Sequence, residues 1–364
     1  MLRRKKNIAP ERILVFRIGS LGDILIAMPS FWRLRQAYPE SELILLTGTS
    51  PDNAKMISAT AILPKSGLFD GYLTYPDAAS PAEAAKMLLE VYKSKAETMV
   101  YLMPRTRSAN AIWRDRFAFR LAGIRHFIGM QHLSGNLLPV NASYPAEKVS
   151  RESDFLWDCL TADEVPGDDW QRRADIGILS GEKQSAVAFL AENYGSNIDR
   201  RLMLAVAPGS KWSSKIWPAE RFAAVLSELR KIYPIVPVIV GDRYDFETGE
   251  QILKRLGDGI NAAGRLDIRT TAAVLQMCAM YLGNDTGAMH LAASVGTSCV
   301  AIFAAIDWPG RWYPIGDGHA VIRKQVECEG CHAPNCPYEN RCLQMIEPEE
   351  VINACKEILS RITN

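Results

Sequence analysis

The chain has 364 residues, which is long for one domain and typical of two. Hydrophobic residues make up 48% of the chain and charged residues 23%, a balance that is ordinary for a soluble globular protein. The formal net charge is +1, so the chain has no global attraction to nucleic acid or to a membrane, and any basic function must be local.

The first residues, MLRRKKN, form a basic run. The segment that follows, IAPERILVF, is too short and too charged for a signal peptide, and no stretch approaches the roughly 20 apolar residues of a membrane span. The run is either a frayed tail or a weak electrostatic tether to an anionic membrane surface. Both interpretations predict a cytoplasmic protein, the second one at the cytoplasmic face of the inner membrane.

Short apolar runs alternate with segments of helical periodicity, which predicts parallel α/β architecture with two doubly wound halves. Strands are expected at residues 13–16, 43–47, 99–103, 202–207, 236–240, 280–282 and 299–303. Helices are expected at residues 24–38, with a kink or restart at Pro29, and at 109–122, 181–194, 219–232 and 347–362. A charged, turn-rich segment between 162 and 201 predicts a linker, which divides the chain into residues 1–175, 176–346 and a final helix in 347–364.

A first motif, RIGSLGD, follows the first strand at residues 17–23. Its glycines, including Gly22, allow a tight turn, and a helix that begins near Asp23 would offer backbone N–H groups to an anion. Asp23 is either a helix cap or a general base that takes a proton from an acceptor hydroxyl. The spacing differs from GxGxxG, which disfavours a dinucleotide site.

A second motif, PGSKWSSKIWP, occupies residues 208–218 after another strand. Ser210, Lys211 and Lys215 are suited to a diphosphate that leaves with negative charge, although a solvated basic turn over packed tryptophans would have the same composition. The third motif, GNDTGAMH, occupies residues 283–290. Thr286 and Gly287 open a helix that can bind phosphate, whereas capping would also explain Asp285 and Thr286. His290 is either a buried core residue or a ligand contact.

These three motifs in this order resemble glycosyltransferase family 9, the ADP-heptose:lipopolysaccharide heptosyltransferases, from about residue 12 to residue 362. The resemblance implies a GT-B fold, in which two Rossmann-like domains face a central cleft. The N-terminal domain would bind the acceptor, and the C-terminal domain would bind a nucleotide sugar. The last helix would cross back onto the N-terminal domain.

The resemblance also implies an inverting, metal-independent transfer that needs no cofactor. Asp23 would be the catalytic base, while Ser210 and Lys215 would contact the donor phosphates. Asp285, Thr286 and Gly287 would lie at the diphosphate and sugar, with His290 nearby. An acidic residue after Gly241 would hold the ribose, either Asp245, which we favour, or Glu247.

By the same resemblance, the donor would be ADP-heptose, and the acceptor a lipopolysaccharide-type or other cell-surface glycan, with no nucleic-acid partner. The alternatives are a sugar-nucleotide epimerase, or a related enzyme with another donor or a protein acceptor.

Arginines gather after the strand at 99–103, at positions 105, 107, 114, 116 and 120. They form either a solvated helix face or a basic wall for a phosphorylated or carboxylated acceptor. Arg105 and Arg107 are the better acceptor candidates because they follow a strand end directly.

Four of the eight cysteines gather at Cys328, Cys331, Cys336 and Cys342. This ligand count suits a structural zinc or iron ion, while reduced or disulfide-linked thiols are the alternative. We expect this cluster to be structural and far from the chemistry.

Overall fold

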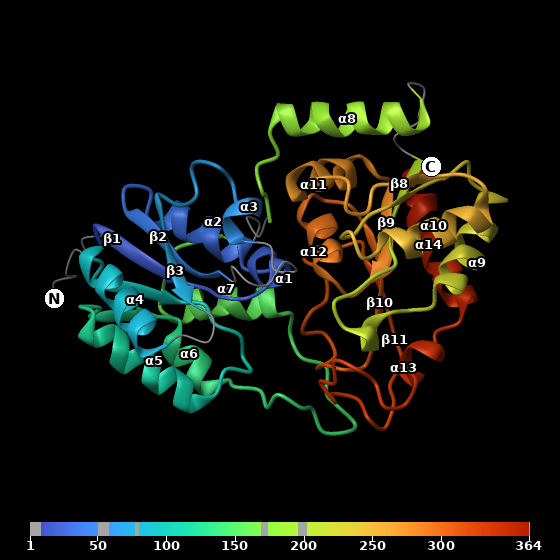
Figure 1. The fold of residues 1–364 in the computed structure, drawn as a ribbon. Coiled ribbons are helices and arrows are strands. Elements are labelled where there is room, and N and C mark those ends of the chain that lie inside the picture. Colours follow the sequence, from blue (N-terminus) through green and yellow to red (C-terminus); the bar gives the residue numbers. More distant parts are fainter. Residues whose placement is uncertain (1–8, 50–57, 77–79, 169–173, 196–201, 364) are drawn as a thin grey trace. The chain divides into compact units, whose positions relative to one another are not determined.

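The computed structural model describes residues 9–49, 58–76, 80–168, 174–195 and 202–363, so the basic run at residues 1–7 lies outside the described residues. The chain divides into two compact units (Figure 1). The first consists of Met1–Pro139 and Glu152–Arg173, and the second of Val140–Arg151 and Ala174–Asn364. No helix among the described residues is long and apolar enough to span a bilayer.

The first unit contains a five-stranded, fully parallel sheet in the order β3-β2-β1-β4-β5. Its strands are β1 (Arg12–Phe16), β2 (Glu42–Thr49), β3 (Gly71–Pro76), β4 (Thr98–Tyr101) and β5 (His126–Ile128). Its helices are α1 (Leu21–Leu25), α2 (Met28–Ala37), α3 (Ala59–Ile62), α4 (Pro81–Lys93), α5 (Ala109–Leu121), α6 (Met130–Gly135) and α7 (Glu152–Ala162). The central strand β1 is buried from Ile13 to Phe16 because helices cover both faces of a parallel sheet.

The second unit contains a six-stranded, fully parallel sheet in the order β11-β10-β9-β6-β7-β8. Its strands are β6 (Met203–Ala207), β7 (Val236–Ile239), β8 (Ile260–Asn261), β9 (Met280–Asn284), β10 (Cys299–Phe303) and β11 (Ala320–Arg323). Its helices are α8 (Ser180–Tyr194), the 3-10 turn η3 (Ser213–Lys215), α9 (Ala219–Arg230), α10 (Phe246–Leu256), α11 (Ile268–Met277), α12 (Gly287–Ser294), α13 (Arg341–Gln344) and α14 (Pro348–Thr363).

The predicted restart at Pro29 is confirmed. Helix α1 ends at Leu25, and α2 begins at Met28, so Pro29 lies in the first turn of the second helix. The strands that the sequence did not predict are β3, β5, β8 and β11, and these are the four edge strands of the two sheets. Edge strands pack on fewer sides than central ones. Their side chains are therefore only partly buried in β5 and β11, and they lack the long apolar run that marks a central strand.

The final helix α14 packs against α9 and the sheet of the second unit. Val351, Cys355, Ile358 and Leu359 form one buried stripe at helical spacing, and all four belong to the core of this unit. The apolar face of this helix is therefore buried inside the second unit. The crossing of this helix onto the N-terminal domain stays a prediction.

Candidate active site

Both sheets reverse their direction of winding at one point. In the first unit β1, β2 and β3 follow one another outward, and the chain then returns to place β4 on the other side of β1. In the second unit the same step places β9 beside β6. Parallel sheets bind ligands beyond the carboxyl ends of the strands at such switch points. The three motifs follow β1, β6 and β9, so each motif lies at a switch point.

Asp23 lies in the first turn of α1 and is held by two neighbours. Its Oδ2 accepts hydrogen bonds from the backbone N–H and the Oγ of Ser20, at 2.8 and 2.9 Å. Its Oδ1 lies 3.3 Å from Nη2 of the fully buried Arg17, which also donates to Leu102 O across the switch point. Gly22 is buried in the same turn. Asp23 therefore caps its helix, yet its side chain remains 21% exposed near the carboxyl end of β1.

Arg105 and Arg107 are occupied by carboxylates of their own unit. Arg105 is buried, with its backbone N–H donating to Glu152 Oε1 at 2.8 Å and its Nε donating to Oε2 at 3.1 Å. Arg107 pairs with the buried Asp115, which also accepts a hydrogen bond from Tyr101 Oη at 2.7 Å. Both arginines therefore have carboxylate partners within the first unit. Their role in binding an acceptor stays a prediction.

Lys215 and Asp285 form an ion pair at the switch point of the second unit. Lys215 ends η3, and Asp285 follows β9 directly. The Nζ atom donates to Asp285 Oδ2 at 2.6 Å, and the side chains are 20% and 8% exposed. An ammonium has three N–H donors, so Asp285 can orient Lys215 without using all of its hydrogen-bonding capacity. In the same loop, Ser210 is half-buried and Lys211 is exposed.

Asn284 joins the loops that follow β6 and β9. Its buried Nδ2 donates to Pro208 O at 2.7 Å, and its Oδ1 accepts a hydrogen bond from the Trp217 backbone N–H at 3.2 Å. The loop that carries Lys215 is therefore fixed against the loop that carries Asp285.

The N-terminus of α12 opens at Thr286 and Gly287 beside this ion pair. The first N–H groups of a helix have no partner within the helix, and the helix dipole makes this end favourable for an anion. Gly283, which lies just before this turn, makes room for the Tyr281 side chain, since a Cβ at this position would lie 2.4 Å from Tyr281 Oη. Burial raises the pKa of Tyr281 well above its usual value, so this phenol stays neutral and donates to Asn284 O at 3.2 Å.

Asp245 lies where the loops after β6 and β7 approach each other. A Cβ at Gly209 would lie 1.7 Å from Asp245 Oδ1, and a Cβ at Gly241 would lie 2.3 Å from Oδ2. The Oδ2 atom also accepts a hydrogen bond from the Asp242 backbone N–H at 2.9 Å. Both glycines thus make room for this carboxylate. The alternative, Glu247, is exposed in the first turn of α10.

The sequence pattern of glycosyltransferase family 9 (heptosyltransferase) matches residues 152–341, just over half of the chain. The chain belongs to glycosyltransferase family 9. Among curated relatives, it is 26% identical to lipooligosaccharide heptosyltransferase 2 of Campylobacter jejuni, over 43% of this chain and 51% of that protein. The chain thus spans about half the length of this relative.

Two solved structures show the same fold. The family 9 glycosyl transferase of Veillonella parvula is 20% identical, with a TM-score of 0.74 over 98% of this chain and 100% of that one. The E. coli ADP-heptose lipopolysaccharide heptosyltransferase II is 18% identical, with a TM-score of 0.65 over 97% and 100%. The two parallel sheets are the Rossmann-like domains of a GT-B fold, as the sequence predicted.

A side-chain cluster that the sequence analysis did not identify follows β10 and lies beside α12. Asp307 Oδ2 accepts a hydrogen bond from Trp312 Nε1 at 2.7 Å, and both carboxylate oxygens lie 3.3 Å from Nη1 of the buried Arg311. The Trp312 ring lies edge-on to His290 of α12, with centroids 6.3 Å apart. Asp307 therefore fixes an aromatic side chain beside the helix that begins at Gly287. The available signal was the position of Asp307 just after a predicted strand.

Of the two interpretations of the cysteine-rich segment, the structure supports reduced thiols and gives no support to a metal site among the described residues. All four cysteines are free thiols, and among the described residues no group of three or more His, Cys, Asp or Glu side chains could hold a metal ion. Cys342 is buried in the core of the second unit and accepts a hydrogen bond from the Ala305 backbone N–H, whereas Cys331 is exposed. The four thiols therefore differ in burial, from the buried Cys342 to the exposed Cys331.

This segment also lies closer to the second motif, at residues 208–218, than expected. Ser213 Oγ donates to Asn335 Oδ1 at 2.7 Å, and the Ser214 backbone N–H donates to Pro334 O at 3.2 Å. The His332 ring packs edge-on against Trp212 at 5.3 Å between centroids. The expectation of a remote cluster is corrected, because residues 328–342 brace η3, which carries Lys215.

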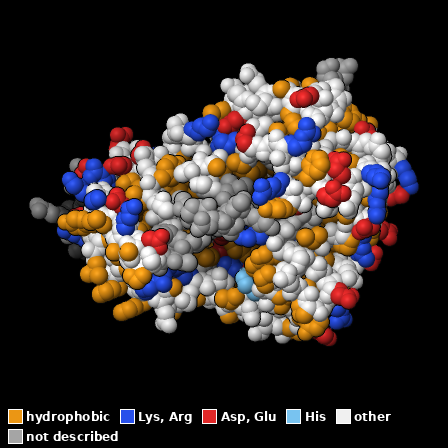
Figure 2. Space-filling model, in the orientation of Figure 1, with side chains coloured by type: hydrophobic (Ala, Val, Ile, Leu, Met, Phe, Trp, Pro, Cys, Tyr) orange, Lys and Arg blue, Asp and Glu red, His pale blue; other side chains and the backbone are white. Residues whose placement is uncertain are grey.

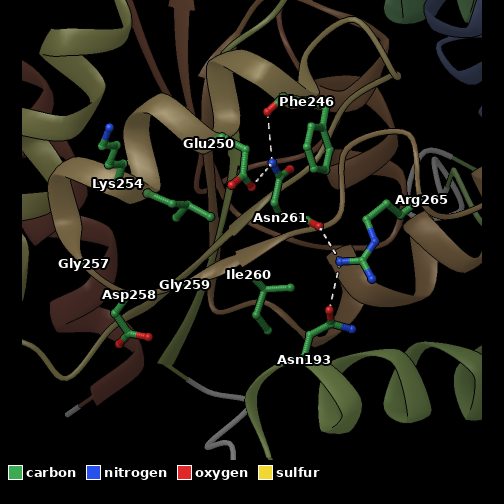
Figure 3. A pocket seen from close by; sticks show the side chains of 11 residues that line it. Asn193, Phe246, Glu250, Lys254, Gly257, Asp258, Gly259, Ile260, Asn261 and Arg265 are labelled. Atoms are coloured by element: carbon green, nitrogen blue, oxygen red, sulfur yellow. Dashed lines mark hydrogen bonds between the residues drawn. The ribbon is translucent and has the colours of Figure 1, made fainter.

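A separate hollow lies between α8, α10 and β8 (Figure 3). Arg265 Nη1 donates to Asn193 Oδ1 at 2.9 Å and to Asn261 O at 3.2 Å across it. Asn261 Nδ2 in turn donates to Glu250 Oε1 at 2.7 Å. None of the family 9 motif residues lines this hollow, and its polar groups bind one another, so we do not place the donor there.

Proposed function

We propose that this protein is an inverting, metal-independent glycosyltransferase that moves heptose from ADP-heptose to a lipopolysaccharide-type or other cell-surface glycan. The observation that carries the proposal is the Lys215–Asp285 pair beside the N-terminus of α12, at the switch point of the second unit. The donor and acceptor classes follow the printed names of the heptosyltransferase relatives.

The second unit would bind the donor. Lys215, Ser210 and the N–H groups at Gly287 would contact the diphosphate, and the Asp245 carboxylate would accept hydrogen bonds from the ribose hydroxyls. Lys215 and the N-terminus of α12 would supply positive charge where the diphosphate becomes a leaving group, which is the role of a divalent ion in many other transferases. Asp285 would orient Lys215, and His290 and Trp312 would border the sugar. The exposed Lys211, in the same loop as Ser210, would add a further positive charge near the diphosphate.

The first unit would supply the base. An acceptor hydroxyl oxygen attacks the anomeric carbon, the carbon–oxygen bond to the diphosphate breaks, and Asp23 takes the hydroxyl proton. The buried Arg17 and the exposed Ser20 hold the Asp23 carboxylate in one orientation, which suits a general base that acts on a bound substrate. We also propose that the enzyme acts in the cytoplasm, where free thiols such as its eight cysteines are stable.

The test compares nucleotide binding by the wild type and two lysine variants. We expect ADP, rather than UDP, GDP or CDP, to raise the melting temperature, and ADP-heptose to raise it further. Lys215→Ala removes a charged hydrogen-bond donor, so the Kd for ADP should rise by roughly 10- to 100-fold. The matched control is Lys231→Ala, which removes an exposed lysine of the same unit that pairs only across the surface with Glu228.

The outcomes separate the parts of the proposal. Equal ADP affinity in Lys215→Ala and Lys231→Ala would contradict the phosphate site. A selective response to UDP or GDP would replace the donor. Consumption of ADP-heptose without any acceptor would favour epimerisation over transfer.

A further inference from the structure

Helix α5 of the first unit exposes an apolar stripe. Trp113, Phe117 and Leu121 follow one another at i, i+4 and i+8, with exposed fractions of 70%, 57% and 71%. The Trp113 and Phe117 rings are parallel within 6°, with centroids 5.9 Å apart. Single exposed apolar residues are common on protein surfaces, but a continuous stripe along about two turns of one helix is typical of an interaction surface.

The stripe continues onto α4. Leu89 and Tyr92, at i and i+3, are 50% and 63% exposed. The Tyr92 ring lies beside the end of α5, because a Cβ at Gly123 would meet Tyr92 Cδ2 at 3.8 Å. We call these five side chains the α4–α5 patch, namely Leu89, Tyr92, Trp113, Phe117 and Leu121. Figure 2 shows hydrophobic side chains gathered at the lower left, over α4 and α5, with arginines and lysines near them.

Positive charge borders the stripe on both sides. At about 100° per residue, Arg116 and Arg120 lie on one side of the apolar stripe of α5 and Arg114 lies on the other. All three are exposed. The single acidic residue of α5, Asp115, is buried and pairs with Arg107 and Arg114. The exposed arc of α5 thus carries aromatic, aliphatic and arginine side chains and no carboxylate.

We propose that the α4–α5 patch is a membrane-docking surface for an anionic phospholipid bilayer. Tryptophan, phenylalanine and leucine on one helix face can enter the boundary between headgroups and acyl chains, while flanking arginines bind lipid phosphates. The absence of exposed carboxylates on the arc of α5 gives charge complementarity to an anionic surface. A protein partner would have to match both the apolar stripe and arginines on its two sides.

The location of the patch is consistent with this use. α5 begins directly after the loop that follows β4, so Trp113 lies near the edge of the sheet that also carries Asp23. The inference goes beyond the proposed transfer reaction, because docking depends on lipid and not on nucleotide or acceptor.

The experiment is flotation of the full chain with vesicles of phosphatidylglycerol and phosphatidylethanolamine, compared with vesicles of phosphatidylcholine. The wild type should float with the anionic vesicles, and added salt should weaken this binding. Replacing Trp113, Phe117 and Leu121 together by serine should weaken binding by about tenfold or more. Because these side chains are exposed, the melting temperature and the response to ADP should stay unchanged.

Two matched controls define the surface. Ile232, Tyr244 and Tyr338 are 56%, 55% and 60% exposed on the second unit, and their replacement by serine should leave flotation unchanged. A variant with Arg116→Gln and Arg120→Gln should lose the preference for anionic vesicles.

A variant with residues 3–6 neutralised to glutamine separates the basic N-terminal run from the patch. Unchanged flotation of the triple serine variant would overturn the proposal, as would absence of wild-type binding to anionic vesicles. Self-association of the wild type that the serine variant abolishes, seen by sedimentation without lipid, would also overturn it by assigning the patch to a second copy of the chain.

Discussion

Asp23→Asn is the most informative substitution in this protein, because it separates the capping role that Asp23 has in α1 from the proposed role as a general base. In the wild type, the Ser20 backbone N–H and Oγ donate to Asp23 Oδ2 at 2.8 and 2.9 Å. Asparagine keeps an oxygen that can accept these two hydrogen bonds, but it cannot act as a general base. A positioned general base contributes roughly 10²- to 10⁴-fold to the rate, or about 3 to 5 kcal/mol of barrier. We therefore expect the kcat for sugar transfer to fall by that factor, with the Kd for ADP nearly unchanged.

The cost to stability should be small by comparison. The change removes the 3.3 Å contact between the Asp23 carboxylate and Arg17, which is buried. Arg17 keeps its hydrogen bonds to Leu102 O and Asp23 O, at 2.9 and 3.0 Å. A loss of roughly 1 to 3 kcal/mol in unfolding free energy is expected for one charged hydrogen bond.

The chain offers a matched control for the capping role. In α4, the Ser80 backbone N–H and Oγ donate to Glu83 Oε2 at 2.8 and 2.7 Å, which reproduces the arrangement of Ser20 and Asp23. Glu83→Gln should leave kcat unchanged. The assay is the initial rate of sugar transfer at saturating donor, together with thermal shift by ADP. A near-normal kcat in Asp23→Asn, or an equal loss in Glu83→Gln, would refute the assignment of the base.

Two further substitutions test the geometry of each unit. Gly209→Ala should abolish the thermal shift by ADP, because the added Cβ would lie 1.7 Å from Asp245 Oδ1 and displace the proposed ribose ligand, whereas Gly181→Ala, with open space at its Cβ, should bind ADP normally. Glu152→Gln breaks a buried ion pair with Arg105, so denaturant unfolding should show a loss of about 3 kcal/mol or more. Unchanged stability in this variant, together with a raised KM for the acceptor, would instead support the predicted role of Arg105 in acceptor binding.

The sequence alone determined the fold class and the family. Central strands of a parallel sheet are buried on both faces, so runs such as ILVF at residues 13–16 and LMLAVA at 202–207 identified them without any partner. The three motifs could be identified from the sequence because a glycine-containing turn after a strand is a local feature. The order of the motifs then sufficed for the resemblance to family 9, which the comparisons confirmed.

Tertiary structure decided what polar side chains contact. Arg105 binds Glu152, which lies 47 positions away in the sequence, and Ser213 donates a hydrogen bond to Asn335, which lies 122 positions away. Only the strand order, which places β4 beside β1 and β9 beside β6, turns separate loops into switch-point sites. An arginine near a strand end has the same local sequence whether it binds a substrate or a buried carboxylate. The difference is a long-range contact, and no local pattern of residues encodes such a contact.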